Sequence, residues 1–346
     1  VSVEPKKVGN SLAPIAACIS TLIVGFVVCQ LAAPIAYEFS ISPKLAIYKR
    51  LYGLNSKAFH EQLWQHIDTL FHRYKDLTNR AERYHLLTPH ELAVFDEAVE
   101  LLQKYGDAKD PRFIAAYREA IRHFDFRDAD GAKERYLRQF IQLSENNNDS
   151  TFFETRFDCS DGFARNAYGA LADHCLLMGD RAVDQNGKNV YFRQAWITGV
   201  RGTLKLKDKP PTVLIDAVLT KARAASRFND KLILAAALKE LIPIELAIYQ
   251  KPGDVYPREI QGVGSVYEIF NDMLTLAEIQ VNRNEFAELD KTLATMTSTY
   301  EKYKNVDTWV ADRFRRVSPD EATQLEHYAR LYPKYAKTLN YMAGNR

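Results

Sequence analysis

The chain lacks an excess of charge of either sign. Its 46 basic and 44 acidic side chains leave a formal net charge of +2 in 346 residues. A nucleic-acid-binding domain usually carries a clustered basic surface and a high isoelectric point. The near balance therefore argues against a nucleic-acid partner, and against a strongly basic domain that lies on a membrane surface.

Cysteine is also scarce, with four residues in the chain. Cys159 and Cys175 are the two that lie outside the N-terminal apolar segment. If residues 160–178 form one helix, these two cysteines are separated by about 24 Å, whereas a disulfide needs Cα atoms within roughly 7 Å. We expect both thiols to be free, which neither requires nor excludes an oxidising compartment.

No arrangement of residues indicates a catalytic, cofactor or metal site. His60 and His66 are six residues apart, so on one helix they would lie about 240° apart and could not share a metal ion. Gly199 and Gly202 lack the lysine of a phosphate-binding loop. We predict no cofactor and no enzymatic activity.

One long stretch, residues 8–37, contains no charged side chain. Residues 12–36 supply twenty-five of these positions, more than the about 20 that a helix needs to cross a bilayer. Pro14 and Pro34 fall in the first and last turns, where proline does not interrupt the span. We predict a transmembrane anchor at residues 12–37.

A cleaved signal peptide is the rival interpretation of this segment. Lys6 and Lys7 would form its basic end, residues 12–28 its core and residues 31–33 its cleavage site. Pro34 would then stand directly after the cut, where we expect it to be poorly tolerated. This position favours an anchor that is retained.

Small residues recur at every fourth position of the predicted anchor: Ala13, Ala17, Thr21, Gly25, Cys29 and Ala33. Bulky residues recur two positions away and therefore on the opposite side of the helix. Such a stripe lets two membrane helices approach closely and gain van der Waals contact that lipid does not provide. We predict that this face packs against a partner helix; the alternative is that an alanine-rich span produces the stripe by chance.

The basic residues that flank the anchor give no clear orientation. Two lysines precede it, and four basic side chains follow within about 20 residues. Because an N-terminal signal-anchor with a large domain behind it usually leaves that domain outside the cytoplasm, we expect a single-pass protein of the bacterial inner membrane with an extracytoplasmic C-terminal domain.

The rest of the chain is predicted to be all-α, because no long segment alternates polar and apolar residues. The expected organisation is a polar tail at 1–11, the anchor at 12–37, a helical subdomain at 42–143, a linker at 144–150 and a second helical subdomain at 151–346. In the second subdomain we expect helices at 160–178, 190–206, 211–227, 230–250, 257–281, 284–304, 306–316 and 319–342. Pro243 should kink or divide the fourth of these helices. Asn186-Gly187 could instead form a small hairpin.

One stretch of the second subdomain resembles the first helix and turn of a tetratricopeptide repeat. The residues that carry the resemblance are Tyr168, Leu171, Ala172, Gly179 and Asp180, after Ala167. The chain departs from the family at Cys175, where an aromatic residue is usual, and in the longer turn at 184–189. The resemblance implies a stack of helical hairpins, an α-solenoid that binds proteins on its concave face.

Two functions are consistent with these patterns. The first is a membrane-anchored scaffold or accessory subunit, with other membrane-complex subunits and the lipid bilayer as partners and homo-oligomers as a further option. The alternative is a membrane-bound enzyme or ligand receptor with a pocket between helices. A long concave surface lined with Tyr and Arg would favour the first, and a buried titratable cluster near Arg165, Asp173 and His174 would favour the second.

Overall fold

The structure is a computed structural model, and it describes most of the chain after residue 42. The described residues are 43–80, 97–102, 104–105, 111–125, 130–147, 150–159, 163–228, 230–249, 266–305, 308–315 and 317–344. They form two compact units, divided between Phe113 and Ile114.

The described part of the chain is almost entirely helical, which confirms the all-α prediction. None of the helices in that part is both long and apolar enough to cross a membrane. The predicted anchor at 12–37, with its small-residue stripe, lies outside the described residues.

In the first unit, helix α2 (Pro43–Tyr52) is followed by the longer helix α3 (Lys57–Arg80). Ser56 caps α3 by accepting a hydrogen bond from the backbone N–H of Phe59 (3.1 Å). The apolar face of α3 packs with the helical residues 97–102 and 104–105, and the ring of Phe59 meets that of Tyr105 edge-on. At the side of this core, His66 Nε2 lies 2.8 Å from a carboxylate oxygen of Glu97.

The second unit begins within helix α5 (Pro111–Asp125) and continues with α6 (Asp130–Asn147) and α7 (Ser150–Glu154). A two-stranded antiparallel hairpin follows, formed by β1 (Arg156–Asp158) and β2 (Ala164–Asn166). In this hairpin Phe157 pairs with Arg165. The strands are too short to show an alternating pattern, and β2 lies within the segment 160–178 that we expected to be one helix.

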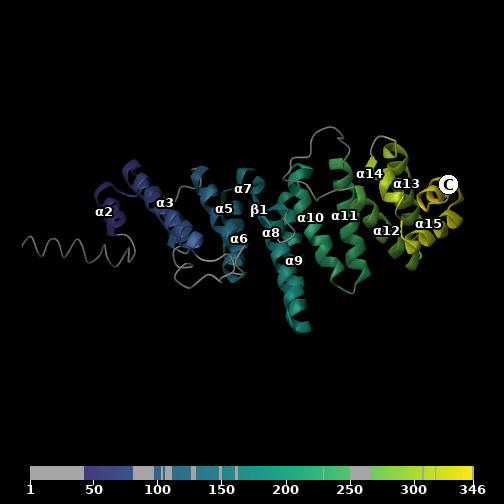
Figure 1. Cartoon of the computed structure of the whole chain (residues 1–346), viewed down its shortest axis with the longest axis horizontal. Helices are drawn as coiled ribbons and strands as arrows, with labels where there is room; N and C mark the ends of the chain where they lie inside the picture. The colour runs from purple at the N-terminus through teal and green to yellow at the C-terminus, as the bar shows by residue number, and fades with distance from the viewer. Residues whose placement is uncertain are drawn as a thin grey trace, which may run out of the picture. The chain divides into compact units, whose positions relative to one another are not determined.

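The hairpin leads into a succession of helices, each of which packs on the next (Figure 1). These are α8 (Ala167–Arg181), α9 (Gln185–Leu206), α10 (Pro211–Ser226), α11 (Lys231–Tyr249), α12 (Val266–Asn282) and α13 (Phe286–Tyr303). Helices α10 to α13 share a large apolar core with the C-terminal helices. Leu238, Met273 and Leu293 are representative residues of this core, and all three are fully buried.

The C-terminal end of the unit consists of α14 (Thr308–Arg315), α15 (Pro319–Leu331), the 3-10 turn η2 (Pro333–Tyr335) and α16 (Ala336–Met342). A capping box starts α15: the Ser318 hydroxyl accepts from the N–H of Glu321, and the Glu321 carboxylate accepts from the N–H of Ser318. Pro333 ends the continuous helix that we expected from 319 to 342.

Three further expectations differ from the structure. Residues 144–147 belong to α6 and not to a linker. Asn186-Gly187 lies in the first turn of α9, where Gly187 N–H donates to the Asp184 side chain (2.7 Å), so no hairpin forms there. Pro243 lies inside α11, which is one continuous helix, so of the two expected effects division does not occur.

Candidate partner-binding face of helix α9

Helix α9 turns its small residues inward. Ala195, Thr198, Gly199 and Gly202 are all buried against α8 and α10. A Cβ atom at Gly199 would lie 2.8 Å from Cβ and 2.9 Å from Cα of Lys221 on α10. Only glycine allows the two helices to approach this closely.

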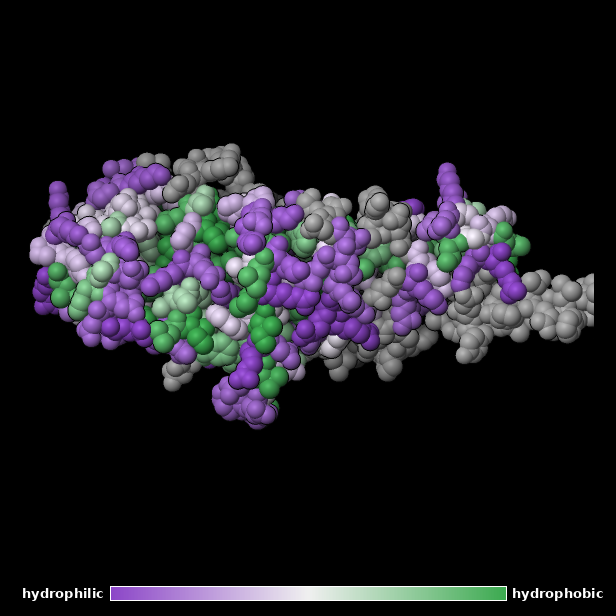
Figure 2. Space-filling model, turned by 180° about the vertical axis from the view of Figure 1, so that it is seen from behind, coloured by the Kyte–Doolittle hydropathy of each residue, from purple (hydrophilic) through white to green (hydrophobic). Residues whose placement is uncertain are grey.

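The opposite side of α9 exposes large apolar residues. Val190, Ile197 and Leu204 are 46%, 57% and 66% exposed, and they follow one another at intervals of seven residues. That interval keeps them on one side of a helix. Figure 2 shows hydrophobic and hydrophilic surface side by side on the part of α9 that projects beyond its neighbours.

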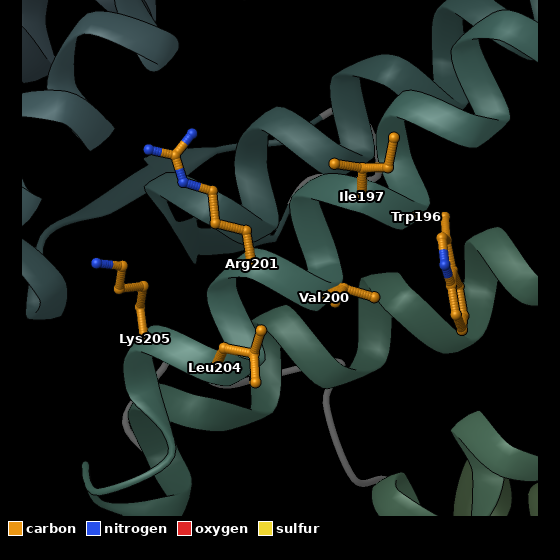
Figure 3. A pocket seen from close by; sticks show the side chains of 6 residues that line it. All are labelled: Trp196, Ile197, Val200, Arg201, Leu204 and Lys205. Atoms are coloured by element: carbon orange, nitrogen blue, oxygen red, sulfur yellow. The ribbon is translucent and has the colours of Figure 1, made fainter.

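We call this exposed side, with Val190, Ile197, Val200 and Leu204 as its apolar residues, the α9 face. The C-terminal half of the α9 face contains a shallow hollow of about 290 Å³. The hollow is lined by Trp196, Ile197, Val200, Arg201, Leu204 and Lys205. The six side chains stand in two rows along the helix, as Figure 3 shows. Trp196, Val200 and Leu204 form one row, and Ile197, Arg201 and Lys205 form the other.

One edge of the α9 face is basic and is held in place by a buried acid. Arg201 donates from Nε to Glu145 Oε1 (2.7 Å) and from Nη2 to Oε2 (2.5 Å), and the Tyr168 hydroxyl donates to Oε1 (2.8 Å). Burial alone would raise the pKa of Glu145, but these hydrogen bonds and the charges of Arg201 and Lys205 bring it below its ordinary value. The Glu145 carboxylate is thus kept charged and fixes the direction of Arg201.

The other edge of the α9 face is bounded by Trp196. The Lys221 ammonium lies 5.5 Å from the centroid of its ring and forms an ion pair with Glu240 (2.5 Å). The ring also meets Phe228 edge-on. These contacts, with Lys221 of α10 and with Phe228 in the turn after α10, hold the indole at the rim of the hollow.

A buried polar network holds the strands against α8 and α10. Asp216 on α10 accepts hydrogen bonds from the Arg156 guanidinium and from the backbone N–H of Asn166 (2.9 Å). The side chain of Asn166 accepts from Gly169 N–H (3.0 Å), which caps α8, and donates to the carbonyl of Val213 (2.7 Å). The network satisfies buried polar groups and positions the start of α8.

Of the titratable residues named above as a possible site, Arg165 and Asp173 come together, and His174 is buried next to Asp173 in the chain. Arg165 Nη1 lies 3.4 Å from Asp173 Oδ1, and Arg223 Nη1 lies 3.9 Å from the same oxygen. Arg165, Asp173 and His174 are each at most 6% exposed. Burial, together with the nearby Asp173 charge, raises the pKa of the adjacent Cys159 thiol to about 11, so it is protonated at neutral pH and is a poor nucleophile.

A second group of acids lies between α10, α11 and α12. Glu245 is fully buried, and neither of its carboxylate oxygens has a hydrogen-bond partner among the described residues. Burial, reinforced by Asp272 and Glu268, raises the pKa of Glu245 to about 9, while Arg223 opposes this shift. Burial and Glu268 likewise raise the pKa of Asp272 to about 7.

The residues of the repeat-like motif all lie on α8. Tyr168, Leu171, Ala172 and Gly179 are buried, and exposed Asp180 pairs with Arg227 (2.8 Å). A Cβ at Gly179 would clash with the Phe192 ring at 2.4 Å, so this glycine allows α8 and α9 to pack. The predicted packing face of the anchor, Ala13, Ala17, Thr21, Gly25, Cys29 and Ala33, lies outside the described residues.

In the part of the chain that the structure describes, no group of three or more His, Cys, Asp or Glu side chains is placed to hold a metal ion. The sequence analysis did not identify the α9 face, although Val190, Ile197 and Leu204 recur at an interval of seven residues.

No protein family model, curated protein or solved structure matches the chain.

Proposed function

We propose that this protein is a membrane-anchored scaffold or accessory subunit of a larger membrane protein complex, and that it binds partner proteins through its helical domain. The observation that carries the proposal is the α9 face. Large exposed apolar side chains in a row on one helix, here Val190, Ile197 and Leu204, are characteristic of surfaces that other proteins cover.

The succession of helices supports a solenoid-like domain. From α8 to α13 each helix packs on the next along the chain, which is the arrangement of stacked helical hairpins. Tyr168 and Gly179 both lie where α8 packs on α9. A stack of this kind offers long helix faces to partners and does not need a catalytic site.

The membrane part of the proposal rests on the uncharged run at 8–37 and on the helix that follows it. Helix α2 exposes Ile47, Leu51 and Tyr52, and the turn after it exposes Leu54. Lys49 and Arg50 stand among them. Tyrosine and basic side chains beside apolar ones suit the headgroup region that borders a membrane span.

Cross-linking mass spectrometry on native membranes tests this function. We expect reproducible links between lysines of the helical domain, such as Lys205 and Lys207, and one or a few membrane proteins. The matched control is the same membrane preparation with the double variant Ile197→Asp/Leu204→Asp. An absence of reproducible links to any neighbour in the wild-type preparation would count against the scaffold.

The alternative, an enzyme or receptor with a pocket between helices, draws on the cluster of Arg165, Asp173 and His174. Each of these side chains is almost completely buried, and the raised pKa of Cys159 removes the nearest nucleophile. The cluster is enclosed, whereas the apolar side chains of the α9 face are exposed, and we therefore favour the scaffold.

A further inference from the structure

The geometry points to a specific kind of occupant for the α9 face. We propose that it binds an amphipathic helix of a partner protein, which places a ridge of apolar side chains between the two rows of α9 and carries carboxylates along the edge that meets Arg201 and Lys205. This inference rests on the proposed function and deepens it by naming the chemistry of the partner.

The first argument is the shape of the α9 face. Trp196, Val200 and Leu204 are four residues apart, as are Ile197, Arg201 and Lys205. Rows at this interval form the ridges of a helix surface, and a second helix packs by laying its own ridge into the groove between them, at a crossing angle of about −50°. The hollow of about 290 Å³ lies between these rows. A helix therefore fits this groove better than an extended strand does.

The second argument is charge. Arg201 is matched by Glu145, but Lys205 beside it adds a second cation to the same edge. Arg193, in line with Ile197 and Leu204, is exposed and forms no ion pair with the residues that the structure describes. The α9 face thus carries an excess of positive charge. Carboxylates on the partner would complement it and would speed and orient association.

The same charges argue against a second copy of this chain as the occupant. If two α9 helices paired in antiparallel fashion about Ile197, Arg193 of one copy would lie opposite Arg201 of the other. Like charges placed across an interface disfavour association. A partner with acidic residues avoids this repulsion and is the better match.

The test uses the full chain in lipid nanodiscs and two fluorescent peptides of about 20 residues, long enough to cover about 30 Å of helix. Both peptides carry leucines at helical spacing on one face; the first has glutamates along one edge of that face and the second has lysines there. We expect the glutamate peptide to bind at least about tenfold more tightly by fluorescence anisotropy. Raising the salt concentration from about 50 to about 300 mM should weaken its binding.

Three variants make the result specific. Ile197→Asp should weaken binding of the glutamate peptide at least tenfold, and Lys205→Glu should reduce or reverse the preference for glutamate over lysine. Leu232→Asp on α11 is the matched control, because Leu232 is a similarly exposed apolar residue (53%) outside the α9 face. Equal binding of the two peptides, no binding of either, or no effect of Ile197→Asp would overturn the proposal.

A photo-reactive amino acid in place of Leu204 identifies what contacts the α9 face. In nanodiscs that contain anionic lipid and the glutamate peptide, we expect an adduct with the mass of the peptide. An adduct with lipid would show that the face binds the membrane, and a cross-linked dimer would show a second copy; either would overturn the proposal. Links to partners elsewhere on the helical domain in native membranes would leave the scaffold function standing when this test fails.

Discussion

Arg201 on α9 binds both carboxylate oxygens of Glu145 on α6, at 2.7 and 2.5 Å. The Glu145 side chain is only 13% exposed, whereas that of Arg201 is 54% exposed. The pair therefore joins two helices at the edge of the α9 face, and the Tyr168 hydroxyl on α8 adds a third helix to the contact. The contribution of this contact to the stability of the protein can be measured by substituting Glu145.

Replacement of Glu145 by glutamine should destabilise the protein by about 1 kcal/mol, because Arg201 and Tyr168 lose a charged acceptor while the half-exposed guanidinium limits the loss. Since the pKa of Glu145 is lowered in the folded protein, its contribution is present above about pH 4.5 and disappears as the pH falls further. The difference between wild type and variant in thermal unfolding should accordingly vanish at low pH.

Glu134→Gln is the control for this measurement. Glu134 also lies on α6 and also pairs with an arginine, Arg138, at 2.8 Å. That pair joins two turns of one helix and no second helix, so we expect its loss to change stability by less than about 0.5 kcal/mol. Equal effects of the two variants would mean that the ion pair between α6 and α9 contributes no more to stability than an ion pair within one helix.

The close approach of α9 and α10 depends on Gly199. In the variant Gly199→Ala the new methyl group would meet the backbone of Lys221 at 2.9 Å, so the helices would have to move apart. We expect a loss of about 1–3 kcal/mol, as for other overpacked interiors. Thermal or urea unfolding measures it, with Gly131→Ala as control, because a Cβ at Gly131 on α6 meets nothing within 4 Å. An unchanged stability of Gly199→Ala would contradict the observed packing.

Glu245 should make the stability of the second unit depend on pH. Its pKa is about 9 in the folded protein and about 4.5 when unfolded. The folded state therefore holds the proton more tightly, and stability falls as the pH rises from about 4.5 to about 9, by at most about 1.4 kcal/mol per pH unit. Asp272, with a pKa of about 7, should add to the same trend.

Glu245→Gln should remove most of this dependence, so that the variant unfolds at a higher temperature than wild type near pH 8 and at a similar temperature near pH 5. Glu278→Gln on α12 is the control, because Glu278 is exposed. A wild-type melting temperature that rises between about pH 5 and pH 8 would show that Glu245 is not held protonated by its surroundings.

Local signals in the sequence are sufficient for several helix starts. Pro43, Pro111 and Pro319 each mark the start of a helix in the structure, as expected from proline in the first turn. The capping box of Ser318 and Glu321 is present at the start of α15. These features depend only on residues a few positions apart, which is why the sequence alone is sufficient for them.

Features set by distant contacts were not predictable in this way. The hairpin of β1 and β2 is held by Asp216, fifty residues after Asn166. The α9 face reverses the usual expectation, since α9 buries Ala195 and two glycines and exposes Ile197 and Leu204. Hydrophobic periodicity alone would place Ile197 and Leu204 inside. The close approach of α9 to α10 at Gly199, and to α8 and α10 at Gly202, leaves no room there for a larger side chain.

The small-residue stripe of the predicted anchor remains open to a direct test. Gly25→Leu should weaken association with the membrane subunit that this helix contacts, because a leucine side chain would keep the partner helix from the close approach on which van der Waals packing in lipid depends. Quantitative co-purification from detergent extracts of native membranes measures the loss, and we expect at least a severalfold decrease in the yield of the partner.

Ile23→Leu is the control, since Ile23 belongs to the bulky row two positions away from the stripe. Both variants should remain in the membrane fraction, because neither makes the segment less apolar. An equal yield of partner with Gly25→Leu and with wild type would mean that the stripe is a by-product of alanine-rich composition, and that any complex is held together by the helical domain.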